Sequence, residues 1–213
     1  MSDFLIAQNL SKRYGTGPMV LSGLTHRFQK GTATGLVGVN GSGKTTFLRL
    51  LSASAYPTEG TILFQGESVF DHPHRYLRYI GMVTDATDLP DYLSATELME
   101  WVLRARKKWD DRDSPEMMIE LFEQLRFDER RNNLIGTYSS GMLQKTMLAC
   151  SLITKPAIIL LDEPFRALDE ESKEAALVLL DAYKKTGGTI LVSSHLQKSL
   201  DQICDEYITF PVV

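Results

Sequence analysis

The residues best suited to chemistry are concentrated in residues 38–46, which read Gly-Val-Asn-Gly-Ser-Gly-Lys-Thr-Thr. This stretch fits the phosphate-binding loop pattern G-x-x-x-x-G-K-[ST]. Backbone N–H groups of such a loop and the positive end of the following helix dipole bind phosphate oxygens. Lys44 can then reach the β- and γ-phosphates of a nucleoside triphosphate, and the Thr45 hydroxyl can ligate Mg²⁺. The expected ligand contacts come from Gly38, Asn40, Gly41, Ser42, Gly43, Lys44, Thr45 and Thr46.

Three more polar side chains follow apolar runs that predict buried strands. Asp162 and Glu163 come directly after residues 157–161, and His195 follows residues 189–192 and two serines. Sheets of this type place their ligands at the C-terminal ends of the strands. We expect Asp162 to hold Mg²⁺ through water and Glu163 to accept a proton from the attacking water. At this edge His195 can contact the γ-phosphate, although a histidine taken alone is more often structural.

A second anion site is predicted where residues 138–142, Tyr-Ser-Ser-Gly-Met, open a helix expected over 143–154. The Ser139 hydroxyl, the Gly141 amide and the helix N-terminus would form it together. In isolation the same residues would indicate a plain helix cap.

The elements that must position these residues alternate between strands and helices, which favours a mostly parallel sheet. Strands are expected up to about Phe28, at 34–37 directly before the phosphate loop, at 60–64 and at 80–83, and again at 157–161 and 189–192. Between the last two, a helix is expected over 170–185, ended by Gly187 and Gly188. Between the strands at 80–83 and 157–161, residues 94–154 have helical patterning, with a capping box at Ser94 and Glu97 and helices expected over 97–108 and 116–125. We therefore expect one domain over 1–213, with an α/β core of 1–85 and 155–213 and an inserted helical subdomain of 86–154.

Composition narrows the class of partner. The chain has 213 residues, 43% of them hydrophobic, and a net charge of −4, which argues against a protein that coats nucleic acid. No signal peptide is evident, and the apolar run of residues 157–161 is too short to span a bilayer. Cys150 and Cys204 are expected to be reduced core thiols in a cytoplasmic protein.

Taken together, these motifs resemble the ATP-binding cassette (ABC) ATPase domain over about residues 4–210. Residues 38–45 match its Walker A motif, 158–163 its Walker B motif, 138–142 its signature and 167–169 its D-loop, and His195 matches its switch histidine. Tyr14 matches the aromatic residue that stacks on adenine. The resemblance implies a P-loop NTPase fold: a RecA-like, mostly parallel sheet with an N-terminal antiparallel β subdomain and an inserted α-helical subdomain.

The resemblance also implies a mechanism. Two cassettes pair head to tail, and each ATP with its Mg²⁺ lies between the Walker A motif of one chain and the signature of the other. A homodimer that powers separately encoded membrane permease subunits, as an exporter on the cytoplasmic face of the membrane, is the simplest assembly. A heterodimer, or a soluble non-transport cassette such as an iron–sulfur assembly ATPase, is the alternative. A GTPase or a small-molecule kinase is disfavoured, because N-K-x-D is absent and those proteins have no signature helix.

The chain departs from the family pattern at three places. Asp85 stands where the family has a glutamine that senses Mg²⁺ and the attacking water; we expect Asp85 to ligate the metal, with Asp88 as a weaker alternative. The signature replaces the usual L-S-G-G-Q but keeps Ser139 and Gly141. Arg166 in the D-loop stands where a small residue is common, and either a contact across the dimer or a solvated surface position fits it.

Overall fold

A five-stranded parallel sheet forms the centre of the molecule in the computed structural model, which describes residues 4–84, 89–127, 129–195 and 197–212. Its strand order is β6-β7-β8-β3-β9. The strands are β3 (Ala33–Val37), β6 (Ile80–Val83), β7 (Ile158–Asp162), β8 (Thr189–Ser193) and β9 (Glu206–Thr209). β8 is buried along its whole length, and β7 up to its last residue, because helices cover both faces of the sheet.

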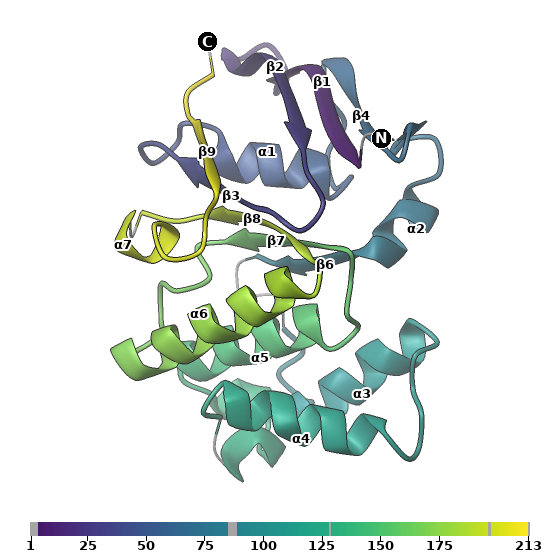
Figure 1. The fold of residues 1–213 in the computed structure, drawn as a ribbon, viewed down its shortest axis with the longest axis vertical. Helices are drawn as coiled ribbons and strands as arrows, with labels where there is room; N and C mark the ends of the chain where they lie inside the picture. The colour runs from purple at the N-terminus through teal and green to yellow at the C-terminus, as the bar shows by residue number, and fades with distance from the viewer. Residues whose placement is uncertain (1–3, 85–88, 128, 196, 213) are drawn as a thin grey trace.

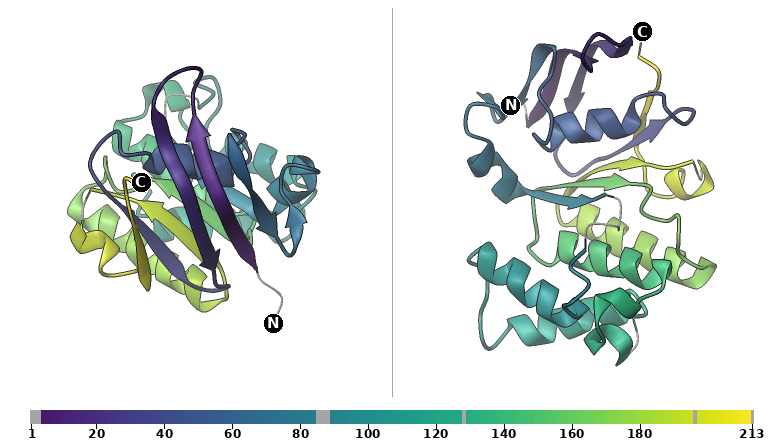
Figure 2. Two further views of the ribbon diagram at one scale, coloured as in Figure 1. Left: turned by 90° about the horizontal axis from the view of Figure 1, so that it is seen from above. Right: turned by 180° about the vertical axis from the view of Figure 1, so that it is seen from behind.

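A smaller antiparallel sheet lies above one face of the parallel sheet (Figure 1). Its strands, in the order β2-β1-β4-β5, are β1 (Leu5–Arg13), β2 (Met19–Phe28), β4 (Glu59–Phe64) and β5 (Glu67–Ser68). Helix α1 (Lys44–Leu51) lies between the two sheets in both Figure 1 and Figure 2. Its fully buried Phe47 belongs to an apolar cluster that includes residues of both sheets, and this packing fixes the start of α1 beneath the antiparallel sheet.

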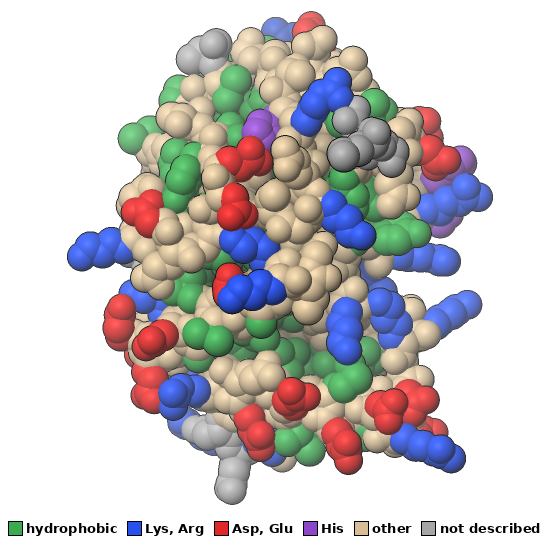
Figure 3. Space-filling model, in the orientation of Figure 1, with side chains coloured by type: hydrophobic (Ala, Val, Ile, Leu, Met, Phe, Trp, Pro, Cys, Tyr) green, Lys and Arg blue, Asp and Glu red, His purple; other side chains and the backbone are tan. Residues whose placement is uncertain are grey.

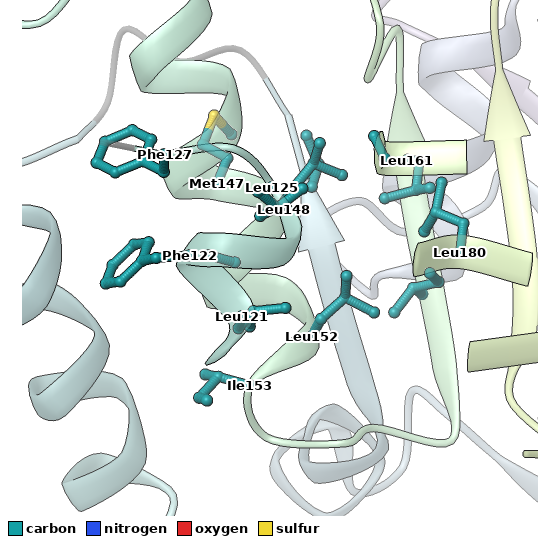
Figure 4. Packing of buried hydrophobic residues seen from close by; sticks show 14 of the residues in the cluster. Leu121, Phe122, Leu125, Phe127, Met147, Leu148, Leu152, Ile153, Leu161 and Leu180 are labelled. Carbon is teal, nitrogen blue, oxygen red and sulfur yellow. The ribbon is translucent and has the colours of Figure 1, made fainter. Parts of the chain in front are cut away.

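The opposite face of the parallel sheet is covered by α5 (Ser140–Leu152) and α6 (Glu170–Lys185). Figure 4 shows how this core continues from the sheet into the helices, with Leu161 of β7 and Leu180 of α6 facing Leu148 and Leu152 of α5. On the far side of α5 the cluster reaches Phe122. Since α5 packs on both the parallel sheet and the outer helices, it connects the α/β core to the helices that lie farther from the sheet.

The outer helices are α3 (Ala95–Ala105) and α4 (Ser114–Gln124). The capping box predicted for α3 is present: the Ser94 hydroxyl accepts the Glu97 N–H, and the Glu97 carboxylate accepts the Ser94 N–H. Hydrogen bonds to this carboxylate hold the pKa of Glu97 below its ordinary value. The helix ends three residues before the predicted end, because Lys107 adopts a left-handed backbone conformation with φ 55°.

The remaining short elements connect these layers. They are α2 (Pro73–Tyr76), η1 (Leu77–Tyr79), η3 (Glu129–Asn132), η4 (Ile135–Thr137) and α7 (Gln197–Leu200). Burial raises the pKa of the thiols of both cysteines, Cys150 and Cys204, to about 12, so both are protonated at neutral pH. In the part of the chain that is described, no helix combines the length and the apolar character needed to cross a bilayer.

Candidate nucleotide site

The phosphate loop connects the end of β3 to the first residue of α1, as the sequence predicts. Gly38, Gly41 and Gly43 have φ angles of 152°, 78° and 108°. A Cβ at Gly38 would lie 2.5 Å from the Phe210 carbonyl oxygen, and one at Gly43 would lie 2.9 Å from the Val20 carbonyl oxygen. The loop is thus confined between backbone segments of β2 and the end of β9, and two of its glycines are required by space as well as by conformation.

Two side chains of the loop are placed to receive phosphate oxygens. Lys44 is 8% exposed, and its ammonium group donates to the carbonyl oxygens of Gly38 at 2.8 Å and Val39 at 3.1 Å. The Ser42 hydroxyl is buried and has no hydrogen-bond partner among the described residues. A buried, unpaired hydroxyl costs stability unless a ligand satisfies it. An anion at the loop would satisfy it, so the residues present fit a nucleotide phosphate.

The other predicted contacts of the loop are more open. Thr45 is exposed and Thr46 is half-buried in the first turn of α1, and Asn40 is exposed. The N-terminus of α1 therefore presents hydroxyl and amide groups to solvent at the place where a phosphate-bound Mg²⁺ would need oxygen ligands.

The two carboxylates expected at the end of β7 are organised by Ser193 of the neighbouring strand. The Ser193 hydroxyl donates to Asp162 Oδ1 at 2.5 Å, and the Glu163 N–H donates to the Ser193 carbonyl oxygen at 3.0 Å. Both carboxylates are half-buried. Sequence reasoning missed the role of Ser193, which follows from the register that pairs Asp162 with Ser193.

Glu163 and His195 are in direct contact. Glu163 Oε2 lies 2.8 Å from His195 Nδ1 and accepts the His195 backbone N–H at 3.3 Å. Glu163 has φ 48°, a left-handed conformation that is uncommon for a residue with a Cβ. This turn directs the two consecutive side chains differently: Asp162 to the Ser193 hydroxyl and Glu163 to the imidazole of His195. The structure thus brings together the two side chains to which we assign water activation.

The predicted signature residues lie at the start of α5. Ser139 is the N-cap, and its hydroxyl accepts the Met142 N–H at 3.3 Å. A Cβ at Gly141 would lie 2.9 Å from the Ala167 carbonyl oxygen, so the signature packs closely against the D-loop. At the end of the D-loop, Asp169 caps α6 and accepts the Ser172 N–H at 2.7 Å, which holds the pKa of Asp169 below its ordinary value.

Tyr14 lies in the turn that joins β1 and β2, and it is 47% exposed. The Lys12 ammonium lies 4.8 Å from the centre of its ring. Val20 lies in β2, a few residues after this turn, and its carbonyl oxygen packs closely against Gly43. The β1–β2 turn therefore lies near the phosphate loop. Asp85 and Asp88, the two candidates for the missing glutamine, lie outside the described residues.

Comparison with known proteins identifies the family. Residues 21–166 match the family model described as ABC transporter. The chain belongs to the ABC transporter family. It carries an ATP-binding cassette of the P-loop NTPase fold and is an ATPase of this family.

Among relatives of this ABC cassette, the uncharacterised ABC transporter ATP-binding protein YybJ of Bacillus subtilis is 33% identical over 87% of this chain and 83% of its own length. The Nod factor export ATP-binding protein I of Ralstonia nicotianae is 30% identical over 95% of this chain and 62% of its own. The doxorubicin resistance ATP-binding protein DrrA of Mycobacterium tuberculosis is 30% identical, and the chain again spans 62% of its length. This chain thus spans 62% of the length of two of these relatives and 83% of the length of the third.

Solved structures give the same fold. One titled as the ATP-binding subunit of an ABC transporter superposes with a TM-score of 0.89 at 26% identity and covers 97% of this chain and 85% of its own. A dimeric ATP-binding cassette in a post-hydrolysis state with ADP and phosphate superposes with a TM-score of 0.86 at 23% identity, over 97% of this chain and 94% of its own, which supports the fold alone.

Proposed function

We propose that this ABC cassette is the ATP-hydrolysing subunit of a transporter, that it dimerises around two ATP molecules, and that it powers a separately encoded membrane permease that acts as an exporter. The observation that carries the catalytic part is the contact between Glu163 and His195 at the strand edge beside the phosphate loop. One relative is named for export, the Nod factor export ATP-binding protein I of Ralstonia nicotianae, and this name supports the exporter part.

ATP supplies the transferable phosphoryl group, and Mg²⁺ neutralises charge on it. In the proposed site Lys44 exchanges the carbonyl oxygens of Gly38 and Val39 for phosphate oxygens, and the loop amides with the Ser42 hydroxyl complete the cradle. Thr45, Asp162 and Asp85 are the proposed metal ligands. Tyr14 provides the face on which adenine stacks.

Glu163 is the proposed general base, which accepts the proton of the attacking water at its carboxylate. Its contact with His195 positions that carboxylate, and His195 is the proposed partner of the γ-phosphate. The partner cassette would close the site with its own Ser139 and Gly141, because two signature residues at a helix N-terminus can bind an anion. Neither site is complete in one chain, so ATP acts as the dimerising ligand.

We also propose that the chain is organised as a nucleotide-binding α/β core of 1–85 and 155–213 and a helical subdomain of 86–154 that ends in the signature helix. The permease would dock on the cassette at the cytoplasmic face of the membrane.

Capture of a tagged Glu163→Gln variant with ATP from detergent-solubilised native membranes tests the transporter part, because a cassette that cannot hydrolyse ATP stays in its ATP-bound assembly. We expect a multi-spanning membrane protein to co-purify, and the Lys44→Ala variant, which should bind ATP weakly, serves as the matched control for the ATP-dependent dimer. Recovery only with proteins of the soluble fraction would contradict the transporter role and favour a non-transport cassette. We expect the wild-type protein to hydrolyse ATP whichever of these two capture results is obtained.

A further inference from the structure

A cavity of about 1020 Å³ opens at the edge of the parallel sheet opposite the nucleotide site. It is lined by the residues that precede three strands, including Tyr79 before β6, Ala157 before β7 and Gly188 before β8, and by the C-terminal ends of α3, α5 and α6. The nucleotide site lies at the other ends of the same strands, so the cavity shares no residue with it.

The floor of the cavity is apolar. Leu121 of α4, Leu152 of α5 and Leu179 of α6 line it, together with Pro156. Figure 3 shows apolar side chains exposed in a hollow on this face, with Lys and Arg side chains along its right margin. An exposed apolar surface in a hollow of this size is typical of a ligand site.

The charge of the lining is strongly one-sided. Six cationic residues line the cavity against a single carboxylate, Glu120, although the chain as a whole has a net charge of −4. The six are Lys30, Arg78, Arg106, Lys107, Lys108 and Lys155.

Two of these cations have structural partners. Arg106 donates to the carbonyl oxygens of Leu77 and Ile80, and Lys108 donates to that of Thr154. The other four are exposed, and within the described residues none of their side chains makes a hydrogen bond or ion pair. These four, Lys30, Arg78, Lys107 and Lys155, are called the free cations below.

Two free cations occupy unfavourable backbone positions. Lys107 has φ 55° and Lys155 has φ 45°, just beyond the ends of α3 and α5. Glycine or asparagine is the usual residue in this conformation, since a Cβ is disfavoured there. Compensation of the helix dipole does not explain them, because a lysine anywhere in the last turn would provide it without left-handed backbone. Both lysines line the cavity.

We propose that this cavity binds an anionic amphiphile, an organic molecule whose phosphate or carboxylate head pairs with the free cations while its apolar body lies on the leucine floor. The volume suits a drug-sized molecule, and the charge suits an anion. The site is separate from the nucleotide site and does not depend on the function proposed above.

Isothermal titration calorimetry with decyl phosphate, below its critical micelle concentration and with saturating Mg-ADP present, tests the proposal. The double variant Lys107→Asn/Lys155→Asn removes two free cations at positions where asparagine is well tolerated, so it should fold. Decyl phosphate should bind this variant at least about tenfold more weakly than the wild type. The control Arg75→Gln/Lys198→Gln removes two exposed charges elsewhere and should bind normally.

Inorganic phosphate and decyltrimethylammonium should each bind the wild type at least about tenfold more weakly than decyl phosphate does. Equal affinity for either probe, equal losses in both double variants, or loss of all binding when Mg-ADP is added would overturn the proposal. Lys107→Gly/Lys155→Gly replaces the asparagine variant if that one unfolds. Flotation with phosphatidylglycerol vesicles then distinguishes the source of the anion: flotation lost in the variant indicates a lipid, and decyl phosphate binding without flotation indicates a free amphiphile.

Discussion

Tyr138, the first residue of the signature, connects the signature to the N-terminus of α3 through its hydroxyl. The substitution Tyr138→Phe removes only that hydroxyl. This hydroxyl donates to the Arg131 carbonyl oxygen at 2.8 Å and accepts the N–H of Ala95, the first residue of α3, at 3.2 Å. The ring packs edge-on against Phe127, with 5.7 Å between the ring centres. Tyr138→Phe should therefore leave the ring packing intact and lose both hydrogen bonds.

The cost follows from burial. Ala95 is fully buried, so its N–H has no access to water once the hydroxyl is gone, whereas the half-buried Arg131 carbonyl can hydrate. One unsatisfied buried donor costs about 1–3 kcal/mol, and we expect Tyr138→Phe to lower the free energy of unfolding by that amount. For a chain of this size the melting temperature should fall by about 2–4 °C for each kcal/mol.

Equilibrium unfolding in urea measures the change directly. Tyr92→Phe is the matched control, because Tyr92 is 72% exposed, and this variant should stay within about 0.5 kcal/mol of the wild type. Tyr138→Leu, which introduces the residue usual at this position of the signature, should be at least as unstable as Tyr138→Phe since it also loses the contact with Phe127. If Tyr138→Phe matches the control, the hydroxyl does not support α3 and the reasoning fails.

Three further predictions concern the nucleotide site and its surroundings. Glu163→Gln should lower the rate of ATP hydrolysis by about 10²–10⁴-fold while ATP binding is retained, and unchanged hydrolysis would exclude Glu163 as the base. Asp85→Gln should change hydrolysis or coupling to the partner more than nucleotide affinity; a large loss of affinity with normal turnover would contradict this. The pKa of Asp169 is lowered in the folded state by the Ser172 N–H, so its contribution to stability is complete above the ordinary pKa of 3.8 and is lost as the pH falls through the lower folded value. Urea midpoints between about pH 6 and pH 3 should fall less for Asp169→Asn, which keeps the cap without the charge, and equal falls would show that Asp169 does not titrate in this way.

The parallel sheet could be predicted because its central strands are continuous apolar runs bounded by polar residues. Helix starts could also be predicted, because Ser94 and Ser139 are N-caps that bind backbone N–H groups only three residues away in the sequence. The end of α6 at Lys185 was predicted correctly from Gly187 and Gly188. The end of α3 was not, because α3 ends before Lys107 becomes left-handed, and neither residue type nor periodicity indicates that a lysine will adopt this conformation. Strand β9 was missed because it is short and its pairing partner, β3, lies far away in the sequence.

The composition of the nucleotide site could be predicted from motifs, but its internal contacts could not. Spacing identified Glu163 and His195 as neighbours of one sheet edge, whereas their contact at 2.8 Å depends on the left-handed turn at Glu163. The role of Ser193 required the register between β7 and β8. Such contacts arise from tertiary packing, and a residue pattern carries no signal for them.

The hydrogen-bond partners of Lys44 and Ser42 indicate how much the phosphate loop must rearrange when a nucleotide binds. Lys44 is held by two neutral carbonyl oxygens and not by a carboxylate. A triphosphate offers charged oxygens to the same ammonium group, and hydrogen bonds to charged acceptors are about twice as strong as those to neutral ones. Ser42 gains a partner without losing one. The three loop glycines already have the positive φ angles of a tight turn. We therefore expect phosphate binding to exchange the partners of one side chain with little rearrangement of the backbone. The conformational work of ATP binding should therefore arise mainly in the approach of the second cassette. Hydrogen exchange of a monomer with bound ATP should show new protection in residues 38–46 and in the turn that carries Tyr14, and little change in α3 and α4.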